Sequence, residues 1–143
     1  VVTHEHDKER YEHKYEYCDL LVTGSGPSGL ASAYSAAKNG AKVILAEDKP
    51  RFGGSLLTSE VTIGNPTRKE WADKIVTELK EMPNVVVKNR AQVFGYYDHN
   101  MLVMSERISE HMPKTEKFMP KQKLWFYRRK LANKLHNKTI SKY

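Results

Sequence analysis

Residues 24–29 read GSGPSG and match the pattern G-x-G-x-x-G. The short apolar run at residues 19–23 comes directly before them and is typical of a strand buried on both faces of a parallel sheet. An apolar helical face with i, i+3, i+4, i+7 spacing follows, made of Leu30, Ala33, Tyr34 and Ala37, and Asn39-Gly40 ends it. In such a unit Gly24 allows a tight turn, Gly26 lets the backbone approach a diphosphate, and Gly29 lets the helix pack on the strand.

A binding mechanism follows from this order of elements. The helix N-terminus directs unpaired N–H groups and a partial positive charge at the glycine turn, where a diphosphate is expected. A second strand, residues 42–46, ends at Glu47, whose carboxylate can accept hydrogen bonds from a ribose and would repel a 2′-phosphate. Nearby Lys49 and Arg51 leave the exclusion of NADP open. The expected cofactor-binding residues are Gly24, Ser25, Gly26, Pro27, Ser28, Gly29, Glu47, Asp48, Gly54, Ser55 and Val93.

The rest of the chain completes the predicted fold. Thr67 and Glu70 form a capping box that begins a second helix, and a buried strand is expected at residues 85–87. Strands at residues 92–97, 101–104 and 123–128 then predict an antiparallel meander, with a turn at 98–100. The prediction is an α/β protein with a Rossmann-like, three-layer FAD/NAD(P)-binding fold. Its parts are a flexible lead-in over residues 1–17, with a helical turn near 8–15, a partial nucleotide-binding domain over 18–130, and a divergent basic tail over 131–143.

Charge and composition restrict the partners. The formal net charge is +7, but residues 114–143 hold ten of the 24 Lys and Arg and one of the 17 acids, so residues 1–113 carry −2. The basicity belongs to the tail, and neither nucleic acid nor a membrane is expected as a partner of the nucleotide-binding unit. No apolar run approaches the roughly 18 residues that span a bilayer. Cys18 is the single cysteine and reads as a packing residue, and a cytoplasmic setting is expected.

Two groups of polar residues could form a metal site or a catalytic dyad, but another explanation fits each of them better. His4, His6 and His13 lie in a segment without a rigid scaffold or a further ligand cluster, so no metal site is predicted. Asp98 and His99 could form a dyad, but residues of this kind at a hairpin turn usually serve the turn. No side chain is assigned a catalytic role.

Several stretches are similar to one family, the alpha subunit of heterotetrameric sarcosine oxidase. The resemblance covers residues 11–129 and is carried by FGGSL at 52–56, LKEMPNVV at 79–86, VFGYYDHN at 93–100 and QKLW at 122–125. It implies an oxidoreductase that demethylates sarcosine to glycine, reduces oxygen to hydrogen peroxide and passes the one-carbon unit to tetrahydrofolate. It also implies NAD, with FAD as the alternative, at Gly24, Gly26, Gly29 and Glu47. Beta, gamma and delta subunits are the implied partners, with an FMN shared with the beta subunit.

The resemblance ends after residue 130. There the family continues with an apolar strand and an Ala-Thr-Gly turn, whereas residues 131–143 are polar and rich in lysine, as in a truncated or frameshifted reading frame. We therefore expect a fold that is incomplete at the C-terminus, with the strand at 20–23 at a sheet edge, and a fragment that is inactive alone. Two alternatives stay open: a generic FAD-dependent pyridine-nucleotide oxidoreductase, and a non-enzymatic basic module that binds through its tail.

Overall fold

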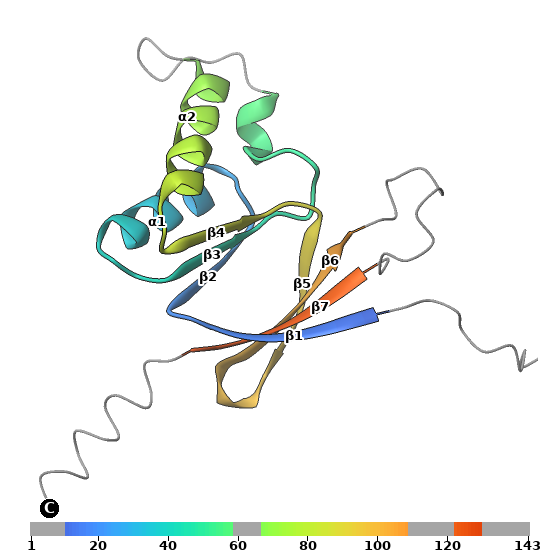
Figure 1. Cartoon of the computed structure of the whole chain (residues 1–143). Helices are drawn as coiled ribbons and strands as arrows, with labels where there is room; N and C mark the ends of the chain where they lie inside the picture. Colours follow the sequence, from blue (N-terminus) through green and yellow to red (C-terminus); the bar gives the residue numbers. More distant parts are fainter. Residues whose placement is uncertain (1–10, 59–66, 109–121, 130–143) are drawn as a thin grey trace, which may run out of the picture.

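Two sheets and two α-helices make up the part of the chain that this computed structural model describes, residues 11–58, 67–108 and 122–129 (Figure 1). A parallel sheet in the order β2-β3-β4 consists of β2 (Leu20–Thr23), β3 (Val43–Ala46) and β4 (Val85–Lys88). A mixed sheet in the order β1-β7-β6-β5 consists of β1 (Tyr11–Cys18), β7 (Gln122–Arg129), β6 (Met101–Arg107) and β5 (Ala91–Tyr97). The helical segments are α1 (Pro27–Lys38), η1 (Gly54–Leu57), α2 (Arg68–Glu81) and η2 (Asp98–Asn100).

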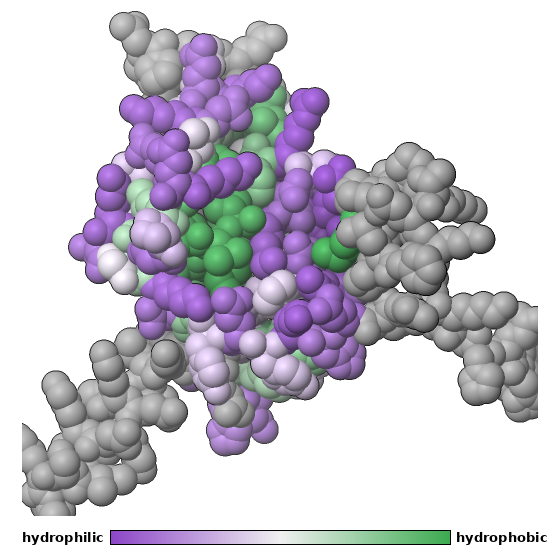
Figure 2. Space-filling view, viewed as in Figure 1, coloured by the Kyte–Doolittle hydropathy of each residue, from purple (hydrophilic) through white to green (hydrophobic). Residues whose placement is uncertain are grey.

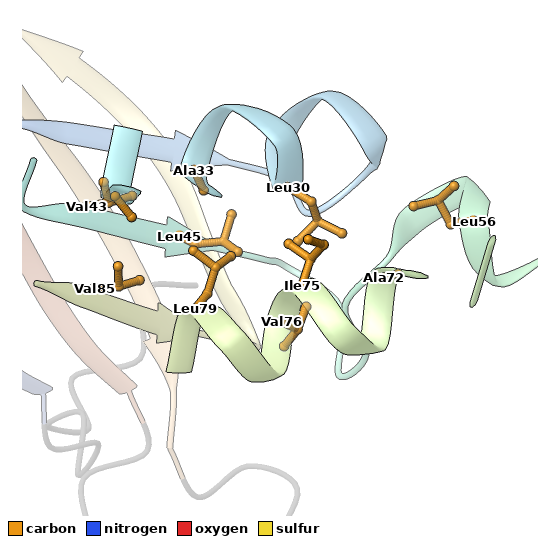
Figure 3. Close-up of a cluster of buried hydrophobic side chains, with 11 residues drawn as sticks. Leu30, Ala33, Val43, Leu45, Leu56, Ala72, Ile75, Val76, Leu79 and Val85 are labelled. Atoms are coloured by element: carbon orange, nitrogen blue, oxygen red, sulfur yellow. The ribbon is translucent and has the colours of Figure 1, made fainter. Parts of the chain in front are cut away.

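The layers are held together by the two faces of β3. All four of its residues are buried, and alternate side chains point to opposite sides of the sheet. Val43 and Leu45 pack with both helices in one core (Figure 3), whereas Ile44 and Ala46 belong to a second core against the mixed sheet. The predicted three-layer α/β fold with a parallel sheet is therefore confirmed.

Helix α2 begins as the sequence predicts, whereas α1 begins inside the glycine motif rather than after it. The N-cap of α1 is Gly26, followed by Pro27 at the first helical position. At α2 the capping box is present, because the Glu70 amide donates to Thr67 Oγ1 at 3.2 Å and the Thr67 amide donates to Glu70 Oε2 at 2.7 Å. Figure 2 shows hydrophobic residues gathered at the helical layer and the parallel sheet, with hydrophilic side chains around them.

The predicted meander is also confirmed. Strands β5 and β6 are antiparallel, and β6 pairs antiparallel with β7. The 98–100 turn joins β5 to β6, and His99 and Asn100 both have positive φ angles there, 63° and 56°. The predicted turn is therefore confirmed, and Asp98 and His99 are exposed in it.

The predicted flexible lead-in is wrong for residues 11–17. They form β1, which pairs in parallel with β7 from Tyr11 opposite Gln122 to Cys18 opposite Arg129. The Tyr15 ring stacks on Phe126 at 4.7 Å, so an aromatic contact supports the pairing of this polar segment. The helical turn expected near residues 8–15 is wrong for the same reason over residues 11–15, and residues 1–10 and 131–143 lie outside the described residues.

Strand β2 departs from its prediction in a different way. It was expected to be buried on both faces, but its four residues are exposed or partly exposed, with Leu20 36% exposed. Within the described residues β2 has β3 as its one neighbour, so the expected position at a sheet edge is confirmed. None of the helices in the described ranges is long and apolar enough to cross a membrane.

Candidate dinucleotide-binding site

Three segments meet at the carboxyl ends of the parallel strands. The turn after β2 is joined to β3 by the Gly24 amide, which donates to Ala46 O at 2.7 Å. The Gly53 amide reaches the same turn and donates to Ser25 Oγ at 3.0 Å. Gly54 lies against it as well, because a Cβ built on Gly54 would stand 3.1 Å from Gly26 Cα. The structure therefore brings together residues that are up to 30 positions apart in the sequence.

The three glycines of the motif are required for different reasons. Gly24 has a φ of +90°, a conformation that side chains rarely adopt. A Cβ on Gly29 would lie 2.0 Å from the carbonyl oxygen of Gly24, so close packing excludes a side chain there. Gly26 has an ordinary φ of −67°, and a Cβ built on it meets no described atom within 4 Å. Neither packing nor backbone conformation explains why residue 26 is a glycine, whereas a ligand lying against the backbone there does.

The N-terminus of α1 adds the electrostatic part of the site. Its first turn contains no acidic residue, and its N-cap forms no side-chain hydrogen bond. The first amides of a helix have no partner within the helix, so those of Ser28 and Gly29 are available to an anion beside Gly26. Pro27 provides a fixed φ and has no amide that would need a partner. These residues fit a diphosphate group.

Glu47 directly follows β3 and is almost completely buried, with 5% of its surface exposed. Its Oε2 accepts hydrogen bonds from the Ser25 amide, at 2.9 Å, and from the Ser25 hydroxyl. Its Oε1 accepts one from the Lys49 amide at 3.0 Å. The carboxylate is therefore placed beside the glycine turn by contacts within the chain, where it can also accept from a ligand hydroxyl.

The remaining predicted site residues lie in different places. Asp48 is exposed, and its pKa is lowered by hydrogen bonding with the Glu47 side chain and then by Lys49. Ser55 is exposed in η1, close to the turn through Gly54. Val93 packs with the core between the two sheets, so its role at a cofactor stays a prediction.

The set of predicted site residues omits Gly53. Its amide holds the Ser25 hydroxyl, and its φ of +124° favours glycine. The Gly-Gly pair at 53–54 was the available signal, because two adjacent glycines are typical of an unusual backbone conformation.

Other chemistry-bearing groups of the described residues lie apart from this site. Burial raises the pKa of Cys18 to about 11, so its thiol is protonated and serves as a packing group. In residues 11–58, 67–108 and 122–129, no group of three or more His, Cys, Asp or Glu side chains is placed to hold a metal ion. His13 lies edge-on to Phe126 at 5.8 Å, and His4 and His6 are outside the described residues.

A parallel α/β sheet, a glycine turn before a helix and a carboxylate after the next strand define the dinucleotide-binding class of domain. The chain belongs to the FAD dependent oxidoreductase family, whose model matches residues 19–125. It is therefore a member of an oxidoreductase family, as the sequence predicts. The family match implies FAD binding and gives no support to NAD as the first cofactor.

Curated relatives confirm the resemblance to the sarcosine oxidase alpha subunit. The one from Rhizobium meliloti (strain 1021) is 40% identical over 123 residues, which cover 86% of this chain and 12% of the relative. The one from Corynebacterium sp. (strain U-96) is 32% identical over 139 residues, covering 94% and 14%. The one from Corynebacterium sp. (strain P-1) is 35% identical over 107 residues, covering 74% and 11%. The chain thus spans less than a fifth of the length of these relatives.

Solved structures agree on the fold. L-proline dehydrogenase from P. horikoshii superposes with a TM-score of 0.60 at 16% identity, covering 87% of this chain and 23% of that one. p-Nitrophenol 4-monooxygenase from Pseudomonas putida DLL-E4 has a TM-score of 0.51 at 15% identity, covering 82% and 40%. At these identities the likeness supports the fold alone.

Proposed function

We propose that this chain binds the ADP half of a dinucleotide, with FAD as the leading ligand. The diphosphate lies at the N-terminus of α1 against Gly26, and a ribose hydroxyl donates to Glu47. The observation that carries the proposal is the open space beside Gly26, because neither packing nor φ requires a glycine at that position. NAD contains the same ADP half and is the alternative ligand.

The described residues contribute binding and orientation. The amides at the start of α1 neutralise the diphosphate, Gly54 keeps the backbone close on the other side, and Glu47 fixes the ribose. When bound, a flavin supplies the two-electron acceptor that oxidation at a carbon–nitrogen bond needs.

The wider role rests on the resemblance and on the relatives. In this proposal the chain represents the dinucleotide-binding region of an oxidoreductase of the sarcosine oxidase alpha-subunit type. The implied reaction is the oxidative demethylation of sarcosine to glycine with transfer of the one-carbon unit to tetrahydrofolate. The resemblance alone supports beta, gamma and delta partner subunits and an FMN shared with the beta subunit. The proposed cytoplasmic location rests on composition, namely a single cysteine and no apolar run long enough to span a bilayer. A generic FAD-dependent pyridine-nucleotide oxidoreductase is the alternative.

Calorimetric titration of the full chain with ADP, FAD and NAD tests the proposal. The wild-type chain should bind ADP and FAD, and Gly26→Val should weaken both at least about tenfold, because its side chain fills the space for the diphosphate. Ala31→Val adds comparable bulk at an exposed position of α1 and should bind as the wild type does.

Two results would overturn the proposal. One is a folded wild-type chain that binds neither ADP nor FAD. The other is a Gly26→Val variant with wild-type affinity. Competition between FAD and NAD for the same chain decides which dinucleotide the site prefers.

A further inference from the structure

Ser25 is the most deeply buried polar residue of the site. Its side chain is completely inaccessible to solvent, and Ser25 and Glu47 are the buried polar residues of the described part of the chain. A buried hydroxyl that lacked partners would destabilise the fold, so its contacts indicate why it is there. Ser25 occupies a variable position of the G-x-G-x-x-G pattern, where the pattern itself requires no hydroxyl.

The Ser25 hydroxyl connects all three segments of the site. It belongs to the glycine turn, donates to Glu47 Oε2 at the end of β3, and accepts the Gly53 amide at 3.0 Å. The Ser25 amide donates to the same oxygen of Glu47 at 2.9 Å. The backbone of Glu47 is fixed separately, because its amide donates to Lys88 O and its carbonyl accepts from the Ala91 amide, both at 2.8 Å. Ser25 therefore controls the side chain of Glu47 and not its backbone.

The acceptor positions of Glu47 show what this control does. A carboxylate has about four positions that accept hydrogen bonds, about two on each oxygen. Ser25 fills both on Oε2, and the Lys49 amide fills one on Oε1. About one position is left, on Oε1, so a ligand hydroxyl that donates there replaces the hydrogen bond between the Glu47 and Asp48 side chains. A ligand hydroxyl can thus meet one defined oxygen.

We infer that Ser25 is a positioning residue for the ligand's ribose: it turns the Glu47 carboxylate so that Oε1 is presented to a ribose hydroxyl. The inference rests on the proposed function. It adds that recognition of the ribose depends on the contact between Ser25 and Glu47. Without the hydroxyl, Oε2 loses one of its two donors and the Gly53 amide loses its acceptor. The carboxylate is then held by the Ser25 and Lys49 amides alone, and its rotation is less tightly fixed.

The test compares two ligands that differ in the ribose alone. ADP carries the ribose hydroxyls, 2′,3′-dideoxy-ADP lacks them, and the ratio of their dissociation constants measures what the hydroxyls contribute. For the full wild-type chain this ratio should be about tenfold or more, as expected for a hydrogen bond to a charged group. Ser25→Ala should lower the ratio to about twofold while keeping measurable binding of both ligands. A purely structural role would weaken both ligands equally and leave the ratio unchanged.

Three further variants sharpen the result. Ser32→Ala removes an exposed hydroxyl from α1 and should keep the wild-type ratio. Ser25→Cys fills the same buried position with a thiol, which is a weak donor, and should also lower the ratio. It provides the test if Ser25→Ala does not fold. Glu47→Gln should lower the ratio too, and adding Ser25→Ala to it should lower it no further, because the two residues act as one unit.

The outcomes separate the inference from the proposed function. If the wild-type chain binds neither ligand, the proposed function fails. If it binds ADP but Ser25→Ala and Ser25→Cys keep the wild-type ratio, or if the effects of Ser25→Ala and Glu47→Gln add, the inference is wrong and the proposed function stands. Hydrogen exchange gives a check without ligand, because the Gly53 amide should exchange faster in Ser25→Ala than in Ser32→Ala.

Discussion

Replacing Gly29 by alanine should destabilise the protein, although general helix propensities predict the opposite. Gly29 lies inside α1, where alanine is favoured over glycine by about 0.5–1 kcal/mol. Its Cβ would, however, stand 2.0 Å from the Gly24 carbonyl oxygen, compared with about 3.4 Å for an ordinary contact. The oxygen must therefore move by about 1.4 Å, and because it belongs to the backbone it cannot turn aside as a side chain would.

The expected magnitude follows from these two opposing effects. Overpacking costs about 1–3 kcal/mol, and the upper end applies because the Gly24 amide is also held by Ala46 O at 2.7 Å. Subtracting the gain in propensity leaves a loss of about 2 kcal/mol in the free energy of unfolding. For a domain of this size the melting temperature should fall by about 8 °C.

Urea denaturation followed by circular dichroism measures this loss. Gly26→Ala is the matched control, since the same methyl group meets no described atom within 4 Å and should cost less than about 1 kcal/mol. The two alanine variants should differ in the urea midpoint at unchanged slope. A Gly29→Ala variant as stable as the wild type would show that the close approach of α1 to the glycine turn is absent.

Three further perturbations test other parts of the structure. Glu106→Ala should lower the free energy of unfolding by about 2 kcal/mol, because it removes the ion-pair partner of Lys88. The Lys88 Nζ lies 3.1 Å from Glu106 between the sheets, and its side chain is only 12% exposed. Glu12 is more exposed, so Glu12→Ala should change the stability little. The amide of the α2 N-cap lowers the pKa of Glu70 from its usual 4.5. The pKa of Glu70 is thus lower in the folded state than in the unfolded state. Its contribution to folding stability is complete above the unfolded-state pKa and is lost as the pH falls through the folded-state pKa. Glu70→Gln should make acid unfolding less steep, and an unchanged acid profile would contradict this. Leu20→Lys should reduce concentration-dependent light scattering, because it places a charge on the exposed edge of β2; scattering equal to that of the wild type would count against pairing at this edge.

The sequence predicted the elements whose signals are local. The glycine turn, the apolar face of α1 and the capping box of α2 each lie within a few residues, and all are present. The pairing of β1 with β7 joins residues more than 100 positions apart, and the alternation of polar and aromatic residues in β1 gives no local sign of its partner. The exposure of β2 was missed because an apolar run indicates a strand but not how completely its two faces are covered.

The same distinction applies to the site. The positions of Gly24 and Gly29 follow from a short pattern, so sequence reasoning found them with their roles. The role of Ser25 depends on contacts with residues 22 and 28 positions away, and no spacing rule indicates which side chain of the turn will make them. Glu47 was found from its distance to the glycine turn, but its burial and its occupied Oε2 could not be read from that distance.

The position of Glu47 depends on the two cores as much as on the glycine turn. β3 lies between β2 and β4, and its side chains reach into the helical core on one side and the mixed-sheet core on the other. The strand therefore has little freedom to shift, and the backbone of Glu47, which directly follows β3, is fixed with it. What the core leaves undetermined is the rotation of the carboxylate, which Ser25 fixes through Oε2 together with the Lys49 amide on Oε1. Backbone placement by packing and side-chain orientation by a buried hydroxyl are thus separate contributions, and substitutions in β3 and at Ser25 should affect ligand binding in different ways.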